Sequence, residues 1–527
     1  MDVRHWILTC SSFYLTSTIQ FYPMYDKAKI REMFSAPNWD FETIQVADEL
    51  TNRVGREQFR LDTYPNQIEI VTSEQMLDAY ALIGLPTSYP HWKFGKDFVL
   101  NQGNYRQGRM GLSYEMVINS NPCISYNMEN NSTCMMLLVI AHACQGHNAF
   151  FKNNYLFKDW TSADSIIDYM VFARDFILEC EEEFGEEEVE ATLDACHALM
   201  DHGVDRYKKP PKLSGKKEQD RLKRLAKVKS ENYNELLRTL PTSIINKKEK
   251  FKNKNERFPK DPEENILYFI EKNAPKLPIW KREIVRIVRK VGQYYYPQTM
   301  TKVMNEGFAT FMHYHIINQI FEEGYLSDGF MLEFIKSHSS VVYQPPYSSR
   351  HFSGINPYTL GFNIFMDIKR ICQQPTEEDR QWFPTLAGRP WLDEVLYAME
   401  NFRDDSFIAQ YLSPKVIRDM RLFSVFDDEE EDYFQIDAIH NERGYRRLRQ
   451  LLSQQYDRSS RVPDIQVEQV DVHKTSKLTL IHKIQNERLL EEDEAQETLR
   501  YVQQLWEFPV ELHSRNRAGI DEDFYEC

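Results

Sequence analysis

The chain has 527 residues and a net charge of −16, and 42% of its residues are apolar. A chain of this length is expected to form two to four domains, and its apolar share is too high for an intrinsically disordered protein. The acidic balance argues against general nucleic-acid binding, and the lack of an 18-residue apolar run argues against a membrane span. We therefore expect a globular protein that binds neither nucleic acid nor membranes.

The eight cysteines are scattered along the chain without a C-x-x-C pair. This spacing supports neither a disulfide framework nor a zinc ribbon; it predicts free thiols in a reducing compartment, so the cytoplasm is the expected location. Residues 1–23 are expected to be a disordered extension, because polar residues interrupt their apolar stretch and no signal-peptide cleavage site follows. Translation starts at Met1 and at Met24 are both compatible with the sequence.

The first third of the chain predicts helices around one pair of strands. Apolar residues at helical spacing run through Asp26–Gly55, with a break at Pro37. Tyr114–Asn119 and Cys123–Tyr126 flank Ser-Asn-Pro, which predicts a strand, a turn and a second strand. The following helix, Cys134–Phe151, begins with a run that is apolar on every face and is therefore expected to be buried.

The middle of the chain contains a strongly basic segment, Lys208–Lys260, with 18 basic and 6 acidic residues. This composition predicts a solvated linker or an exposed charged helix. The alternative is a docking strip for an acidic partner or for the acidic remainder of the chain. Helices are expected on both sides of this segment, at Ala163–Phe184, Glu186–His202, Glu263–Lys272, Trp280–Tyr295 and Met300–Glu323.

The C-terminal part predicts six elements in the order strand, helix, strand, strand, helix, strand. They are Tyr433–His440, Glu442–Tyr456, Ile465–Val472, Lys477–Ile484, Glu492–Phe508 and Val510–His513. This order is the ferredoxin-like signature. The predicted fold class is therefore α+β and mainly helical, with a large helical core, a short β-hairpin before a buried His-bearing helix, and a small ferredoxin-like domain.

Changes in composition predict the division of the chain. The helical core is expected in two parts, 24–207 and 261–426, separated by the basic segment 208–260. An acidic tract at 427–432 is the expected hinge to the ferredoxin-like domain at 433–514. A tail is expected at 515–527.

The first candidate site is Ala141-His-Ala-Cys-Gln-Gly-His147, at the end of the buried helix. Two imidazoles in an apolar core need polar partners, and metal ligation provides one. On a regular α-helix His142 and His147 would point about 140° apart, because five residues separate them. A π-bulge, which Gly146 would ease, would bring the rings to one side. A metal site and two hydrogen-bonded core histidines are both open interpretations.

The second candidate site is Met304-Asn-Glu-Gly-Phe-Ala309, where Glu306 and the later His313 fall on one apolar helical stripe. The string Asn-Glu-Gly-Phe-Ala resembles the helix of gluzincin aminopeptidases, in which the glutamate is the third zinc ligand. The resemblance implies that Glu306 joins His142 and His147 and leaves one position open for water. His313 is a further candidate ligand. The expected cofactor is one divalent metal ion: zinc, iron or manganese.

Two features depart from a gluzincin peptidase. Position 143 is Ala where the zincin general base would be Glu, and the two ligand segments lie more than 150 residues apart. Glu115, on the strand before the His-bearing helix, is the candidate for the missing catalytic base or for a fourth ligand. A surface or hydrogen-bonded structural role for Glu115 is the alternative.

Three more residues are candidates for the same site. His197 and His338 could line it. Cys144 lies between the two motif histidines, where a nucleophile is conceivable but a packed core thiol is commoner.

Six strings keep a common order along the chain: Tyr114–Asn119, Ala141–Tyr155, Gly203–Pro210, Met304–Thr310, Gln344–Tyr347 and Ser353–Tyr358. They resemble the SpoVR family, the stage V sporulation protein R-like proteins. The similarity extends from about Met24 to about His513, and Phe308 stands where the family is expected to have Trp.

The resemblance implies a cytoplasmic, regulatory protein of a bacterial sporulation programme, through spore cortex formation, or of a stress or stationary-phase programme. It implies a PrkA-type serine protein kinase and a von Willebrand-type protein as partners, and it brings no established reaction. Three hypotheses remain: a regulator that acts through protein contacts, a metal-dependent hydrolase with a His/His/Glu site, and a purely structural histidine cluster.

Overall fold

The computed structural model describes residues 26–206 and 258–527 apart from short gaps, together with residues 208, 210 and 221. The gaps are 83, 107–112, 348, 351, 423, 427–434, 438–440, 459–461, 473 and 486–487. The expected N-terminal extension, the acidic hinge and nearly all of the basic segment therefore lie outside the described residues.

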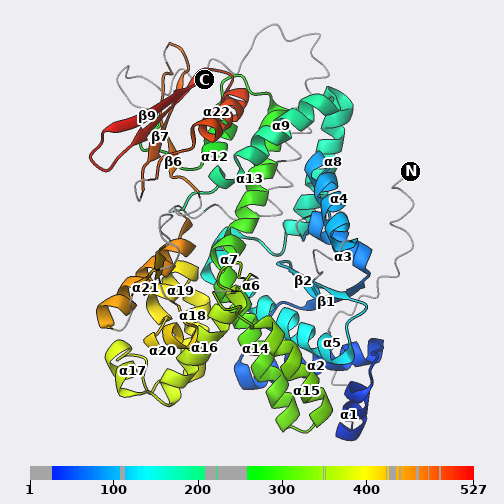
Figure 1. Ribbon diagram of the computed structural model, residues 1–527. Coiled ribbons are helices and arrows are strands. Elements are labelled where there is room, and N and C mark those ends of the chain that lie inside the picture. The colour runs from blue at the N-terminus through cyan, green and yellow to red at the C-terminus, as the bar shows by residue number, and fades with distance from the viewer. Residues whose placement is uncertain are drawn as a thin grey trace. The chain divides into compact units, whose positions relative to one another are not determined.

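Two units are each assembled from stretches that are far apart in the sequence (Figure 1). The first unit contains the described residues up to Pro86, then Trp92–Lys158 and Gln298–Asp457. The second contains Thr87–His91, Asp159–Pro297 and Arg458–Cys527. This grouping differs from the division expected from composition, because each unit takes residues from both sides of the basic segment.

The first unit is mainly helical. Its early helices are α1 (Lys27–Ser35), α2 (Phe41–Phe59), α3 (Ser73–Ala81), α4 (Trp92–Arg106), α5 (Thr133–Ile140), α6 (Asn148–Asn153) and α7 (Tyr155–Trp160). Its later helices are α14 (Lys302–Glu322), α15 (Asp328–Val341), α16 (Pro357–Gln373), α17 (Glu377–Trp382), α18 (Trp391–Asn401), α19 (Asp404–Tyr411), α20 (Pro414–Asp419) and α21 (Glu442–Tyr456). The break expected at Pro37 separates α1 from α2, and the capping box of Asp40 and Thr43 starts α2.

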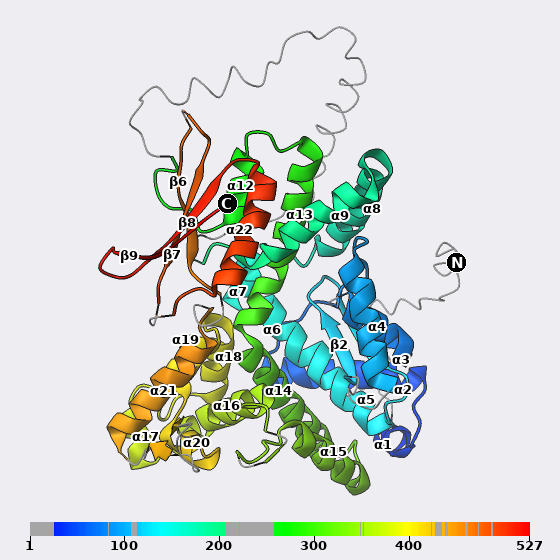
Figure 2. The same ribbon diagram turned by 45° about the horizontal axis from the view of Figure 1, so that its top comes forward.

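A three-stranded sheet in this unit has the order β1 (Asn66–Val71), β3 (Cys123–Met128), β2 (Glu115–Ile118). Strand β3 pairs with β1 in parallel and with β2 antiparallel, so β2 is an edge strand. The expected strand, turn and second strand are thus confirmed. Strand β2 lies beside the helix that follows β3, as Figure 2 shows.

The predicted buried helix is also confirmed, as one continuous helix over Thr133–Asn153. It consists of α5, a π-helix η2 (Ala141–His147) and α6. Among the described residues this helix alone is long and apolar enough to cross a membrane, and 94% of its most apolar window is buried inside the protein.

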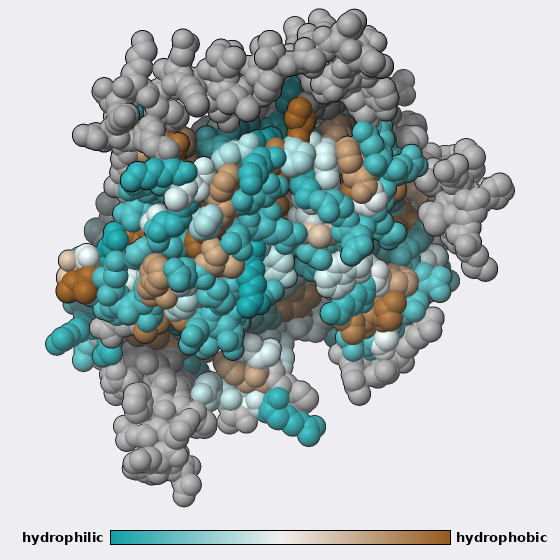
Figure 3. Space-filling model, turned by 90° about the horizontal axis from the view of Figure 1, so that it is seen from above, coloured by the Kyte–Doolittle hydropathy of each residue, from teal (hydrophilic) through white to brown (hydrophobic). Residues whose placement is uncertain are grey.

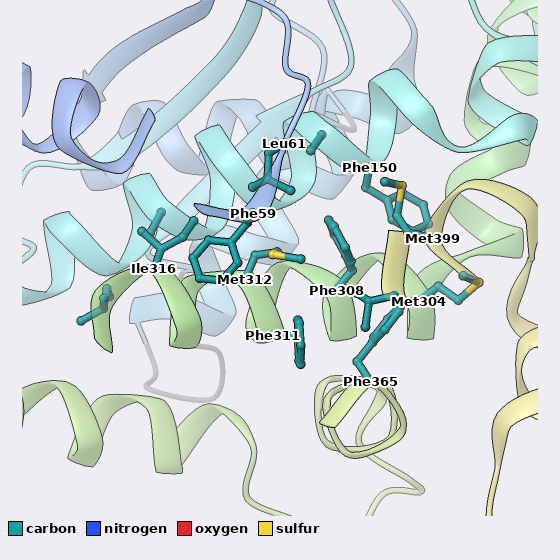
Figure 4. Packing of buried hydrophobic residues seen from close by; sticks show 14 of the residues in the cluster. Phe59, Leu61, Phe150, Met304, Phe308, Phe311, Met312, Ile316, Phe365 and Met399 are labelled. Carbon is teal, nitrogen blue, oxygen red and sulfur yellow. The ribbon is translucent and has the colours of Figure 1, made fainter. Parts of the chain in front are cut away.

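Aliphatic, aromatic and methionine side chains form the core between this helix and the later helices of the unit (Figure 4). Phe308 of α14 lies between Phe150 of α6 and Phe365 of α16, with ring centroids 6.1 and 5.7 Å away. The face in Figure 3, by contrast, is mostly hydrophilic where residues are described, and its apolar side chains form small separate groups.

Glycines allow three helix backbones to approach closely in this core. A Cβ atom added to Gly146 of η2 would lie 2.5 Å from the Cα of Ala309 in α14. A Cβ atom on Gly307 of α14 would overlap the backbone of Gly361 in α16, and the reverse also holds. Helix α14 is therefore held between η2 and α16 by contacts that a larger residue would prevent.

The second unit combines helices with a four-stranded sheet. Its helical elements are α8 (Ile166–Phe184), α9 (Glu186–Ala198), the 3-10 turn η3 (Met200–His202), α12 (Ile266–Asn273), α13 (Ile279–Met300) and α22 (Glu492–Trp506). The sheet order is β6 (Ile465–Val470), β7 (Leu478–Lys483), β8 (Val510–Arg515), β9 (Asp521–Glu526). Strands β7 and β8 are parallel, and the other two pairs are antiparallel.

The expected ferredoxin-like arrangement is therefore wrong. The strand β5 (Gln435–Asp437) pairs with β4 (Ser424–Phe426) and not with the four-stranded sheet. Helix α21 buries Tyr445, Leu448 and Leu452 in the core of the first unit. Residues expected to form a tail instead provide β9, which pairs with β8.

The close helix contacts generate a stability prediction. Gly307→Ala is expected to lower the free energy of unfolding by about 2 kcal/mol, because the methyl group would separate α14 from α16. Gly103→Ala in α4 is the matched control, because no neighbouring atom lies within 4 Å of its added Cβ. In a helix, alanine is more favourable than glycine by about 1 kcal/mol. Urea unfolding of both variants measures the difference. Equal stabilities would show that the helices separate without cost.

Candidate metal centre

The π-helix places His142 and His147 together. The N–H of Asn148 donates to the carbonyl oxygen of Ala143, five residues back, as a π-helical turn requires. The two histidine rings are 4.5 Å apart and nearly perpendicular. The π-helical distortion that would bring the two rings to one side is present in the structure.

Helix α14 brings Glu306 to both histidines. Its Oε2 atom is 3.5 Å from Nε2 of His147 and 3.7 Å from Nε2 of His142. The three ligand atoms lie within 4.8 Å of one another. The Oε2 atom of Glu306 is buried and has no hydrogen-bond partner among the described residues. Burying such an oxygen costs free energy unless a cation or another polar group interacts with it.

The edge strand β2 adds a second carboxylate. Oε1 of Glu115 is 3.8 Å from Nε2 of His142, and 18% of the Glu115 side chain is exposed. The sequence-based hypothesis placed Glu115 at this site, and the structure brings it there.

These groups line one cavity of about 760 Å³ in the first unit. Strand β2, helix α14 and the segment around α16 all contribute to its wall, with Lys302, Asn356 and Tyr358 among the lining residues. The Tyr358 ring stacks over His142 at 6.3 Å, and the carboxylate of Glu306 raises the pKa of its hydroxyl. A cavity of this size accommodates a ligand of tens of atoms.

Asn305 orients His147. Its Oδ1 atom lies 2.9 Å from Nδ1 of His147, and an amide oxygen can only accept a hydrogen bond. His147 therefore carries a proton on Nδ1, which leaves Nε2, on the side of Glu306, as the nitrogen that a metal ion would bind. Ligand histidines in metal sites are commonly oriented by a bond of this kind.

His313 lies behind His142 and not among the converging ligand atoms. Its Nδ1 is 3.0 Å from Nδ1 of His142, and its Nε2 is 2.9 Å from Nδ1 of His338 on α15. Both ring nitrogens are thus engaged by other histidines. His313 was a candidate metal ligand, but it is instead the middle member of a chain of three histidines. Each of the two hydrogen bonds in this chain holds one proton.

The charges of the site are strongly coupled. Burial, followed by the nearby His147, lowers the pKa of His142 to about 4. Burial opposes ionisation of His147 and Glu306, but each stabilises the charge of the other, which raises the pKa of His147 and lowers that of Glu306. Burial raises the pKa of Glu115 to about 7. Without a metal ion, the charges of His147 and Glu306 thus stabilise each other at the point where a cation would bind.

The other candidates do not line the cavity. Cys144 is fully buried, and burial raises the pKa of its thiol well above the ordinary value, so it is not poised as a nucleophile. His338 contributes only through the histidine chain. Asn305 and Tyr358 stood inside the motifs quoted above, but nothing in their spacing indicated these roles.

The second unit holds another group of potential ligands, His91, Glu190 and Asp194, whose donor atoms lie within 4.8 Å of one another. His91 Nε2 is 3.1 Å from Oδ1 of Asp194, and its ring stacks on His197 at 4.6 Å. The structure thus places His197 in this second group.

The histidine chain gives a testable prediction. His313→Leu is expected to lower the free energy of unfolding by about 1–3 kcal/mol relative to His313→Gln, because leucine leaves the buried Nδ1 of His142 without a partner. Glutamine retains a polar group in reach of that atom. Urea unfolding of both variants provides the comparison, and equal stabilities would mean that the bond between the two histidines contributes nothing.

Comparison with known proteins agrees with the motifs. The SpoVR-like protein family matches residues 38–461, and the SpoVR-like C-terminal domain matches residues 463–517. The chain is 53% identical over 491 residues to the "Uncharacterized protein YcgB" of Escherichia coli (strain K12), a match that covers 93% of this chain and 95% of the relative. No solved structure matches. The chain therefore belongs to the SpoVR family.

Proposed function

We propose that the chain is a metal-dependent hydrolase that cleaves an acyl bond. The observation that carries this proposal is the convergence of His142, His147 and Glu306 on one point of a cavity wall, with the carboxylate of Glu115 beside them. Two histidines and one carboxylate are a common ligand set of catalytic zinc sites, which keep a further position open.

The distances between the donor atoms fit a bound cation. Ligands at about 2.1 Å from a tetrahedral ion lie roughly 3.4 Å from one another. Glu306 Oε2 is 3.5 and 3.7 Å from the two Nε2 atoms, so small side-chain movements suffice. The hydrogen bond from Nδ1 of His147 to Asn305 leaves Nε2 of that ring available as a ligand.

The chain's residues have separate roles in this reaction. A divalent cation at the site would polarise the acyl oxygen and lower the pKa of a bound water to about 7. Glu115 would accept the proton of the attacking water and pass it to the leaving group. For an amide, a C–O bond forms and the C–N bond breaks, which yields a carboxylate and an amine. Glu115 on β2 thereby takes the place of the base that Ala143 cannot provide.

The cellular setting of the proposal comes from the family resemblance. We place the hydrolase in a bacterial sporulation or stress programme, with a PrkA-type serine protein kinase and a von Willebrand-type protein as partners, where cleavage would have a regulatory effect. The seven described cysteines are all free thiols, which supports a cytoplasmic location.

Metal content is the first test of the site. Protein prepared without a histidine tag or chelators is expected to hold zinc, iron or manganese, and His142→Ala and Glu306→Gln should each lose one equivalent. His315→Gln, on the same helix but outside the cavity lining, should keep it. Elemental analysis measures the content. An equal metal content in all four proteins, or none after reconstitution, would leave the histidines with a structural role only.

Catalysis by Glu115 is tested separately from metal binding. Glu115→Gln should retain the metal and lower kcat by about 10²–10⁴-fold, because the amide cannot accept the proton. Suitable probes are a library of random decapeptides, followed by mass spectrometry, and a series of aminoacyl p-nitroanilides. A Glu115→Gln protein as active as the wild type would contradict the assigned role, and a metal-loaded wild type inactive on both probes would contradict an amide hydrolase.

A further inference from the structure

The outer edge of β2 presents backbone groups beside the candidate site. The N–H of Met128 donates to the carbonyl oxygen of Tyr114, and Glu115 pairs with Asn127. In an antiparallel pair, successive residues point their N–H and C=O groups alternately toward and away from the partner strand. Tyr114 and Met116 therefore face β3, whereas the backbone groups of Glu115 and Val117 point outward.

The cavity runs along this edge. It is lined by the five consecutive residues 113–117. Side chains of successive strand residues point to opposite faces of a sheet. A cavity that touches all five residues therefore reaches both faces and passes around the outer edge of the strand. Tyr80 of α3 lines it as well, and its hydroxyl is bonded to Ser113.

We propose that an extended peptide binds along the outer edge of β2 as an additional strand and is the substrate of the site. This inference rests on the proposed hydrolase function and names its substrate class, a polypeptide in extended conformation. The backbone of such a peptide would pair with the outward N–H and C=O groups of Glu115 and Val117. The described residues make no hydrogen bonds with these groups.

The geometry at Glu115 connects binding with chemistry. Its backbone lies on the outer edge, while its carboxylate is 3.8 Å from Nε2 of His142. A peptide that pairs with Glu115 therefore has its own amide groups next to the converging ligand atoms. Peptide amides recur every two residues along one edge of a strand, about 6.6–6.8 Å apart, as do the outward groups of Glu115 and Val117. A substrate without such a repeat lacks this complementarity.

Hydrogen exchange provides a direct test that does not require cleavage. The Glu115→Gln protein, loaded with zinc, is incubated with the random decapeptide library. The amides of residues 115 and 117 are expected to exchange at least tenfold more slowly with the peptides than without them. Unchanged exchange at both amides, at peptide concentrations up to a few millimolar, would overturn the inference.

A proline substitution tests the same contact. Val117→Pro removes the outward N–H without removing a bond to β3, since proline is tolerated on edge strands at such positions. Val117→Ala is the matched control that shortens the side chain but keeps the N–H. We expect Val117→Pro to bind the decapeptides about tenfold more weakly than Val117→Ala, while both contain the same amount of metal. Equal affinities would contradict pairing at this edge.

The two proposals fail in different ways. If zinc-loaded wild-type protein cleaves the p-nitroanilides but the decapeptides neither protect residues 115 and 117 nor are cleaved, the hydrolase stands and the strand-addition site falls. If the peptides protect these amides but no probe is cleaved, a peptide-binding edge exists and the hydrolase falls. Neither protection nor cleavage would overturn both.

Discussion

Close contact between helix backbones is the constraint on which the candidate site depends. Gly146 of η2 meets Ala309 of α14, and Gly307 of α14 meets Gly361 of α16, at separations that leave no room for further side-chain atoms. Glu306 directly precedes Gly307, so the contacts that pack α14 in the core also set the backbone position from which its carboxylate reaches the histidines. Close helix packing thus sets the backbone positions of the site, from which small side-chain movements complete its geometry.

Hydrogen bonds between side chains explain why the core around the site tolerates several polar groups. His142, His313 and His338 hydrogen-bond to one another in sequence, and Asn305 satisfies His147. The Oε2 atom of Glu306, by contrast, is buried without a hydrogen-bond partner among the described residues, and the two imidazoles lie 3.5 and 3.7 Å from it. A buried carboxylate oxygen without a hydrogen-bond partner, beside histidines that are held by other bonds, is the arrangement expected of a site that receives a ligand.

Local sequence patterns predicted the elements that form the site. The apolar run after Cys134 predicted the buried helix, and the spacing of His142 and His147 indicated that a π-bulge would be needed to bring the two rings to one side. The pairing partners of the later strands could not be predicted in this way, because local periodicity does not encode which strands meet. The apolar face of α21 satisfied the ferredoxin-like pattern, but it packs in the first unit, and β9 formed where no strand was expected.

The residues around the site also differ in how well the sequence predicts them. Histidine and glutamate on apolar stripes are conspicuous in a sequence, because buried ionisable groups need partners. Asn305 and Tyr358 are ordinary residues for the start of a helix, and only the folded chain places them against His147 and His142.

The separation of His147 and Glu306 along the chain has a consequence for the whole first unit. They are 159 residues apart (306 − 147), so a cation bound by both would close a loop of that length. A covalent cross-link between these points would remove about 5 kcal/mol of chain entropy from the unfolded state. A metal ion bound at this site would act as a reversible cross-link, and its supply would set how long the unit survives unfolding and proteolysis.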